Sequence, residues 1–429
     1  MDKAAFNEAL IEFLSQATTP YHAVEAMVAQ LKAVGFEDVD DGAVPQAGGG
    51  GVFERRGGSL IALMPGSKPL QESGVRMVGA HTDSPCLMVK PRPEQSSAGY
   101  AQLGVEVYGG ALLNPWFDRD LSLAGRVSYL DENGGVATAL VDFRRPIAVV
   151  PSLAIHLDRE ANSGRKVNAQ TMMSPILALG DADSFSLRDL LKDEIEQQGL
   201  TCNEVLEYEL CFYDTQRAAL VGLKDEFIAS ARLDNLLSCF IGLQAMKGSA
   251  GEEWSLLVCN DHEEVGSQSA SGAQGPMLRQ FLESLCGESL TLSSLIRNSM
   301  MISVDNAHGV HPNFADKHDP KHGPKLNSGP AIKVNASQRY ASSSDGAGLF
   351  QVLARRVDEP VQSFVMRADM ACGSTIGPIT AGELGVTTLD IGVPTFGMHS
   401  IRELAGSDDA YSLYRILGEY YRTPAPLLP

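Results

Sequence analysis

The chain has 429 residues, a formal net charge of −19 at pH 7, and hydrophobic residues at 44% of its positions. This length exceeds what one ordinary hydrophobic core accommodates, so we expect two domains. The strongly acidic charge argues against nucleic-acid binding. No run approaches the roughly 18–20 consecutive apolar residues of a membrane span, so we expect no membrane partner.

The first residues and the cysteines predict a cytoplasmic protein. Residues 1–8 contain no basic segment followed by an apolar stretch, so we expect no signal peptide. The seven cysteines are an odd number without metal-binding spacing, and most lie inside apolar strings such as Val258-Cys259. We interpret them as reduced, buried small side chains, which fits a reducing compartment.

In chain order, residues 1–35 have a helical pattern, and residues 59–64 and 75–80 are predicted strands. His81 follows the second strand, and Asp83 lies two residues further on. A carboxylate in that position can accept the second imidazole N–H, which fixes the tautomer of a metal-ligating histidine. The alternative is a surface histidine in a turn.

The pattern changes after residue 90. Residues 105–108, 123–130 and 136–141 alternate or carry β-branched side chains between turns, which is typical of strands, and residues 186–195 read as a helix. We therefore divide the chain into a discontinuous catalytic domain, residues 1–90 and 231–429, and a β-rich insert, residues 91–230.

Asp234 begins the next helical pattern, in which Leu236, Phe240 and Leu243 recur at i, i+4 and i+7. An aspartate at this place is either a helix cap or a residue that bridges metal ions. Nothing in the local pattern decides between the two roles.

Two adjacent carboxylates follow the next predicted strand. Residues 254–259 form an apolar run, and Asp261-His262-Glu263-Glu264 comes directly after it. Ligands of open α/β sheets bind at the carboxyl ends of strands, so one glutamate can hold a metal ion while its neighbour transfers a proton. A solvated acidic loop is the alternative.

Two further strand patterns end near residues of ligand type. Residues 300–304 precede Asp305, and residues 385–391 precede His399. Ser400 and Glu403 match a capping box, which predicts a helix beginning at Ser400 with His399 just outside it.

Together these segments offer two imidazoles and several carboxylates, a donor set that suits zinc, manganese or cobalt. Five ligands exceed the need of one tetrahedral zinc ion. Two metal ions about 3.5–4 Å apart, bridged by a carboxylate, would use all of them. A nearby carboxylate that binds no metal would then transfer the proton of an activated water molecule. The pattern predicts metal-assisted hydrolysis.

Five strings in series resemble the aspartyl aminopeptidase family of co-catalytic zinc metallopeptidases, and the resemblance, to a bacterial member, covers nearly the whole chain. The strings are residues 79–85, 232–235, 262–267, 303–308 and 398–403. The resemblance implies an α/β fold with a mixed central sheet flanked by helices, and a β-rich insert that serves oligomerisation.

The resemblance also implies the role of each site residue. The implied ligands of two zinc ions are His81, Asp234, Glu264, Asp305 and His399. Asp234 bridges the ions, Glu263 is the general base, and Asp83 orients His81.

Members of the family form tetrahedral dodecamers whose active sites face an interior chamber. The string 154–159 matches a segment whose histidine enters a neighbouring subunit's site, so the resemblance implies that His156 stabilises the oxyanion. Without the resemblance, His156 reads as an ordinary strand-edge histidine. Residues 369–378 match a loop that lines the pocket.

The expected reaction is removal of the N-terminal residue from peptides with a free N-terminus, with a preference for acidic residues. Ser328 departs from the family pattern, which has a basic residue just before the Gly-Pro at this place. A neutral-preferring aminopeptidase is therefore an alternative, as is a deacylase or carboxypeptidase built on the same metal core. A catalytically inactive assembly protein is a more remote one.

Overall fold

A computed structural model describes residues 1–287, 290–425 and 427 of the chain. It divides into two compact units. The first comprises Met1–Asp83, Ala218–Met398 and the described residues from Glu403 onward, and the second comprises Ser84–Arg217 with the short segment His399–Arg402. Among the described helices, none combines the length and the apolar character needed to cross a membrane.

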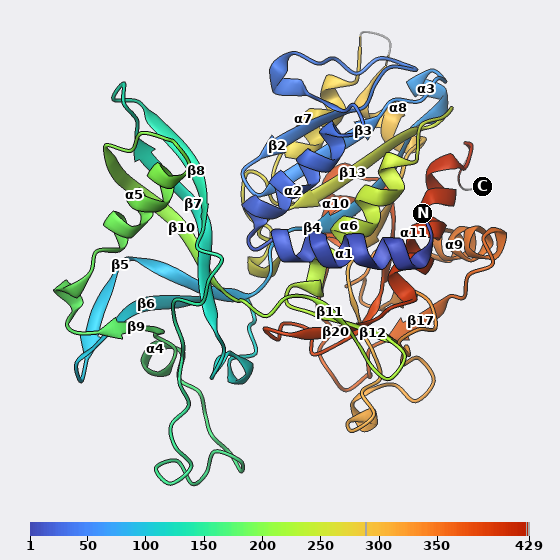
Figure 1. The fold of residues 1–429 in the computed structure, drawn as a ribbon. Helices are drawn as coiled ribbons and strands as arrows, with labels where there is room; N and C mark the ends of the chain where they lie inside the picture. Colours follow the sequence, from blue (N-terminus) through green and yellow to red (C-terminus); the bar gives the residue numbers. More distant parts are fainter. Residues whose placement is uncertain (288–289, 426, 428–429) are drawn as a thin grey trace. The chain divides into compact units, whose positions relative to one another are not determined.

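The first unit is built on a nine-stranded sheet (Figure 1). Its strands, in spatial order, are β1 (Glu37–Asp38), β2 (Val52–Arg56), β3 (Ser59–Met64), β13 (Trp254–Asn260), β4 (Val75–His81), β14 (Met300–Val304), β18 (Thr387–Gly392), β16 (Ala331–Val334) and β17 (Gln362–Val365). Strands β13, β4, β14 and β18 are parallel, whereas β3 and β16 run antiparallel to their neighbours β13 and β18. The predicted mixed central sheet is confirmed.

Helices cover both faces of this sheet, because its central strands are buried on both sides. Successive residues of β4 point to opposite faces, so Met77 and Val78 belong to different buried clusters. One face packs against α1 (Lys3–Gln16), α2 (Pro20–Lys32), α6 (Leu233–Lys247), α9 (Ser344–Arg356) and α11 (Asp409–Arg422). The other packs against α3 (Leu70–Ser73), α7 (Met277–Ser284), α8 (Leu292–Arg297) and α10 (Ile376–Leu384).

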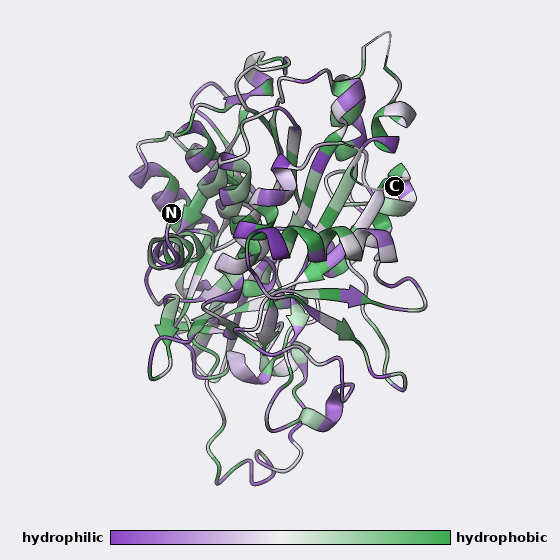
Figure 2. Cartoon of the chain, turned by 90° about the vertical axis from the view of Figure 1, so that its right-hand side faces the viewer, coloured by the Kyte–Doolittle hydropathy of each residue, from purple (hydrophilic) through white to green (hydrophobic). Residues whose placement is uncertain are grey.

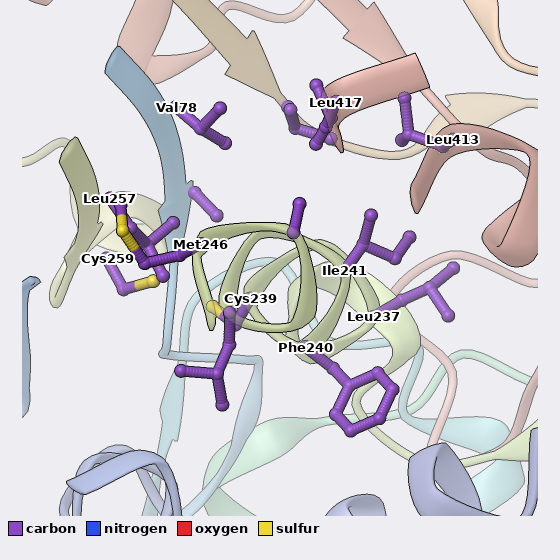
Figure 3. Close-up of a cluster of buried hydrophobic side chains, with 14 of the residues drawn as sticks. Val78, Leu237, Cys239, Phe240, Ile241, Met246, Leu257, Cys259, Leu413 and Leu417 are labelled. Carbon is purple, nitrogen blue, oxygen red and sulfur yellow. The ribbon is translucent and has the colours of Figure 1, made fainter. Parts of the chain in front are cut away.

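Helix α6 is buried on all sides, since every residue from Leu233 to Met246 is buried. Figure 3 shows its side chains reaching Val78 and Leu257 of the sheet in one direction and Leu413 of α11 in another. Figure 2 shows the hydropathy of each residue along the ribbon, with hydrophobic residues prominent in the strands and hydrophilic residues in several connecting loops. Helix α6 has no hydrophilic face toward solvent, so packing on all of its sides stabilises it.

A five-stranded sheet adjoins the first unit's core, with the order β11 (Ala219–Val221), β12 (Phe227–Ser230), β20 (Glu403–Gly406), β19 (Pro394–Phe396) and β15 (Ala307–His308). The predicted helix at Ser400 is wrong, because β20 begins at Glu403 and pairs with β12. The Glu403 carboxylate accepts the backbone N–H of Asp234 at 2.8 Å instead of closing a capping box. The partner of Glu403 is therefore Asp234, far away in sequence, and not Ser400 three residues before it.

The second unit is β-rich, as expected for the insert. Its six-stranded antiparallel sheet has the order β8 (Val136–Asp142), β7 (Leu121–Leu130), β10 (Glu204–Asp214), β5 (Cys86–Ser97), β6 (Tyr100–Tyr108) and β9 (Ile176–Leu179). Helix α5 (Leu187–Gln197) is capped by the Ser186 side chain, and α4 (Ala169–Met172) is a single turn. All seven cysteines of the chain are free thiols.

The start of α10 offers a test of close packing. A Cβ added at Gly377 would lie 2.4 Å from both carboxylate oxygens of Asp390, whereas one added at Gly382 in the same helix would meet nothing within 4 Å. Gly377→Ala is therefore expected to lower the free energy of unfolding by about 1–3 kcal/mol, the usual cost of overpacking. Gly382→Ala is expected to raise it by up to about 1 kcal/mol, the difference in helix propensity. Urea unfolding of both variants measures the two effects, and equal shifts would contradict the packing described.

Candidate metal centre

Three parallel strands bring ligand-type side chains to one edge of the central sheet. Residues His81 and Asn260 are register partners at the carboxyl ends of β4 and β13. On the other side of β4, β14 ends at Val304, directly before Asp305. The carboxyl ends of parallel strands meet at the same edge, which is why residues more than 200 positions apart in sequence lie close together here.

The imidazole of His81 lies at the centre of these carboxylates. Its Nε2 is 3.5 Å from an oxygen of Asp234 and 3.7 Å from an oxygen of Asp305. Its side chain is only 2% exposed, so the ring is held inside the protein. These distances are longer than direct hydrogen bonds, and the three side chains present their lone pairs to a shared space.

Asp83 connects the histidine to the two adjacent glutamates. One of its carboxylate oxygens is 3.4 Å from Nδ1 of His81, and its backbone carbonyl is 3.1 Å from the same nitrogen. The two carboxylate oxygens accept the backbone N–H groups of Glu263 and Glu264 at 3.0 and 3.1 Å. A single buried residue therefore contacts both the imidazole and the backbone of the turn that carries the two glutamates.

The two glutamates lie in a short 3-10 turn, Glu263–Val265, that follows β13. His262 precedes the turn with a left-handed φ of 66°, and its ring is hydrogen-bonded to Ser269 rather than to the cluster. Glu263 reaches to 4.0 Å from Nε2 of His81. The turn thus directs both carboxylates, but not the histidine before them, toward the shared space.

Asp234 enters from the start of α6, where its backbone angles and those of Asn235 are not helical. Its N–H donates to Glu403, and the Asn235 side chain donates to the carbonyl of Val304 at 2.8 Å. These bonds hold the first turn of α6 against β14 and β20. Glu403 was not predicted as a site residue, because its sequence pattern resembled a helix cap.

Within the described part of the chain, two groups in the first unit bring three ligand atoms within 4.8 Å of one another. One is His81, Asp234 and Asp305, and the other is His81, Glu263 and Glu264. Four carboxylates around one imidazole match the nitrogen and oxygen donors that zinc takes. The donor set therefore fits one or more divalent cations.

The crowding of carboxylates changes their acidity. Burial and the neighbouring carboxylates raise the pKa of Glu263 to about 7 and that of Glu264 to about 10. Burial would also raise the pKa of Asp305, but Lys333 and His81 lower it well below its usual range. For His81, burial lowers the pKa, and the surrounding aspartates raise it well above its usual value by a larger amount. The concentrated negative charge is what a divalent cation would neutralise.

Lys333 is a site residue that the sequence did not reveal. It lies on β16 and is 2% exposed, and its ammonium group is 3.1 Å from a carboxylate oxygen of Asp305. The same group lies 5.2 Å from the ring centroid of Tyr340. A charged residue inside the apolar string Ala331–Val334 was the available signal, because a buried lysine requires a partner.

The first unit contains a cavity of about 290 Å³, and Phe364, the register partner of Lys333, lies in its wall. Its walls are mainly apolar and aromatic, with Phe364, Met370 and Phe396 among them. His308, three residues after Asp305, also lines it, as do His311 and His318. A cavity of this size and character can receive one amino-acid side chain.

Two predicted site residues belong to the second unit. His399 lies in the segment His399–Arg402, has a φ of 67°, and its Nδ1 is 3.2 Å from the carbonyl of Gly110. His156 is exposed in a turn between Ala154 and Asp158, not at a strand edge. The predicted roles of both residues remain predictions.

A sheet edge that gathers buried carboxylates and an imidazole is typical of a metal-dependent hydrolase. Consistent with this, the family model described as "Aminopeptidase I zinc metalloprotease (M18)" matches residues 13–421. The chain therefore belongs to the M18 family of zinc metalloproteases, which are aminopeptidases.

Individual proteins support the same assignment. The chain is 56% identical over 421 residues to a "Probable M18 family aminopeptidase 2" of Ectopseudomonas mendocina, covering 97% of this chain and 98% of that protein. Among solved structures, one titled "Cryo-EM structure of the Ape4 and Nbr1 complex" has a TM-score of 0.93 at 36% identity, covering 98% of this chain and 86% of that one. The S. cerevisiae mApe1 dodecamer has a TM-score of 0.84 at 26% identity, covering 98% and 97%.

Proposed function

We propose that this aminopeptidase hydrolyses the N-terminal peptide bond at a dinuclear zinc centre and prefers acidic N-terminal residues. The observation that carries the proposal is the convergence of His81, Asp234, Asp305 and the glutamate pair at one buried edge of the sheet. Membership of the M18 family supports zinc as the metal.

The proposed ligands would hold two ions. Asp234 would bridge them, and the terminal ligands would be His81, Glu264, Asp305 and His399. One ligand atom each of Asp234, His81 and Asp305 lie within 4.8 Å of one another, which supports Asp234 as a ligand. The bound ions supply an activated water molecule and a polarised scissile carbonyl.

Glu263 is the proposed general base. Its carboxylate accepts the proton of the attacking water and delivers it to the amine of the leaving peptide. Asp83 holds the N–H of Glu263 at 3.0 Å and therefore fixes the backbone from which this carboxylate extends. His156, from a neighbouring subunit, would donate a hydrogen bond to the oxyanion that forms at the attacked carbonyl.

The acidic preference rests on Lys333. Its buried ammonium group lies beside Asp305, so a substrate bound at the cluster has a cation near its first side chain. A salt bridge to a buried cation discriminates strongly between charged and neutral side chains. Lys333 would thus supply the positive charge that Ser328 does not.

A neutral-preferring aminopeptidase is the second candidate. The cavity lined by Phe364 is mainly apolar, although Lys317 and Arg367 also line it, and this apolar surface favours an uncharged side chain. The pairing of Lys333 with Asp305 also neutralises part of the charge of Lys333. The two candidates share the reaction and differ only in the N-terminal residue removed.

We also propose a homododecamer in a reducing compartment such as the cytoplasm. The proposal of twelve subunits rests on the related S. cerevisiae mApe1, whose structure is described as a dodecamer. The seven free thiols support a reducing environment. Sedimentation velocity of the purified protein distinguishes a dodecamer from smaller assemblies.

A panel of aminoacyl p-nitroanilides tests the function. We expect hydrolysis of the glutamyl and aspartyl substrates, with kcat/KM at least about tenfold above that of the leucyl substrate, because one buried ion pair contributes more than about 1.4 kcal/mol. A faster leucyl substrate would replace the acidic preference with the neutral one. N-acetylated substrates serve as the control, and their hydrolysis would indicate a deacylase or an endopeptidase.

A further inference from the structure

Asp390 is a fully buried carboxylate on β18 that the proposed chemistry does not use. One of its oxygens accepts the backbone N–H of Ala341 at 2.6 Å, and the other accepts the hydroxyl of Thr375 at 2.7 Å. Its own N–H donates to the Ser342 hydroxyl at 3.1 Å. The side chain therefore joins one strand to two separate loops.

These two loops also bind each other. The Ser374 hydroxyl donates to the carbonyl of Arg339 at 3.3 Å. We call residues 339–342 and 372–375 the two-loop wall. It is held together by this bond and by the carboxylate of Asp390, which accepts from both loops.

The two-loop wall faces Lys333 through Tyr340. The Tyr340 ring is 4% exposed, and its centroid lies 5.2 Å from the Lys333 ammonium group and 6.3 Å from the Phe364 ring. Lys333 and Phe364 are register partners on β16 and β17, so their side chains stand next to each other. The position of Tyr340 thus defines one side of the space in which Lys333 lies.

Packing alone does not account for an ionisable group at position 390. Burial raises the pKa of Asp390, so the site stabilises its charge only in part. An apolar residue of similar volume would leave the Ala341 N–H and the Thr375 hydroxyl without this acceptor. A carboxylate instead offers two acceptors in fixed directions, and Gly377 packs against it so closely that no Cβ fits between them. The arrangement favours precise placement of the loops.

We propose that Asp390 is a positioning residue that holds the two-loop wall, and Tyr340 within it, against Lys333 and so sets the selectivity for the N-terminal side chain. The inference rests on the proposed function in one respect, namely that Lys333 contacts the first side chain of the substrate. Asp390 itself touches neither substrate nor metal.

The test compares Asp390→Asn with the wild-type protein in the ratio of kcat/KM for glutamyl and leucyl p-nitroanilides. The amide has one acceptor oxygen in place of two, so either the Ala341 N–H or the Thr375 hydroxyl loses its acceptor. We expect the ratio to fall by about fivefold to twentyfold, the effect of one misplaced charge-assisted contact. A loss of folded protein lowers both rates equally and leaves the ratio unchanged.

Glu253→Gln is the matched control. Glu253 is an equally buried carboxylate that accepts from Ser73 at 2.8 Å and pairs with Lys68 and Arg76, but it precedes β13 at the amino end of the strand. We expect this variant to lose stability and keep the wild-type ratio. Thr375→Val removes one of the two bonds to the Asp390 carboxylate, together with the N-cap bond of α10 from the Gly377 N–H. It should give a smaller fall in the ratio, which provides a second test if Asp390→Asn misfolds.

Hydrogen exchange of residues 339–342 and 375–377 provides a readout independent of activity. The amides of residues 339–342 or of residues 375–377 should exchange faster in Asp390→Asn than in Glu253→Gln. Unchanged exchange of these amides would overturn the positioning role. If the wild-type protein prefers the glutamyl substrate, an unchanged ratio of glutamyl to leucyl kcat/KM in Asp390→Asn would overturn it as well. If the wild-type protein hydrolyses both substrates equally, the acidic preference fails, and selectivity set by Asp390 is overturned with it.

Discussion

Glu263→Gln is expected to lower kcat by about 10²–10⁴-fold, the usual contribution of a positioned general base, while the protein keeps its full metal content. Glutamine has nearly the same shape and keeps the backbone N–H that donates to Asp83 at 3.0 Å, so the turn should stay in place. What the variant lacks is a carboxylate able to take the proton of water. Steady-state kinetics combined with metal analysis by mass spectrometry measures both effects.

The adjacent residue provides the control. Glu264 is held by the same Asp83 side chain, at 3.1 Å, but its proposed role is to bind metal. Glu264→Gln should therefore lose metal as well as activity, and added zinc should restore part of the activity. If Glu263→Gln loses metal and Glu264→Gln does not, the two roles are exchanged. Activity of Glu263→Gln close to the wild-type level would contradict the role of Glu263 as the general base.

Asp234→Asn is expected to reduce the bound metal from two ions per chain to one or none and to lower activity by at least about 10³-fold. An amide offers one neutral oxygen in place of two anionic ones, and loss of the metal removes the activated water. The backbone N–H that donates to Glu403 remains, so the start of α6 should keep its position. Metal analysis and activity are measured on protein purified without chelators.

Asp409→Asn is the matched control for this variant. Asp409 is also fully buried and accepts backbone N–H groups, from Asn327 and Gly329, but no metal-ligand group found among the described residues includes it. The Asp409→Asn variant should keep two metal ions per chain even if its free energy of unfolding falls. Two ions retained in Asp234→Asn would rule out Asp234 as the bridge.

The strand ends were predictable because their patterns are local. Residues 75–80, 254–259 and 300–304 are short apolar runs, and the structure has β4, β13 and β14 there. Parallel strands buried on both faces read as continuous apolar sequence, and ligands collect at their carboxyl ends. The sequence alone therefore indicates His81, Glu263, Glu264 and Asp305 as candidates.

The supporting residues were not predictable, because their partners lie far away in sequence. Glu403 has a strong local capping pattern, yet its carboxylate bonds to the N–H of residue 234. Lys333 and Asp390 each interrupt an apolar strand, and only the packing of neighbouring loops shows why. A one-dimensional pattern records which faces are buried but not which polar group lies at the other side of the contact.

Helix α6 has a consequence for the chain before it folds. Because residues 233–246 are buried on every side, the unfolded chain exposes a long apolar segment directly behind the proposed bridging ligand. Segments of this kind associate with one another or with chaperones until their partners are available. Helices α1 and α2 and strand β4 precede α6 in the chain, but α11 and the strands after α6 are synthesised later, so one part of its binding surface is absent when the helix leaves the ribosome. The burial that surrounds α6 in the folded protein thus leaves part of its apolar surface exposed in the nascent chain until these later elements have been made.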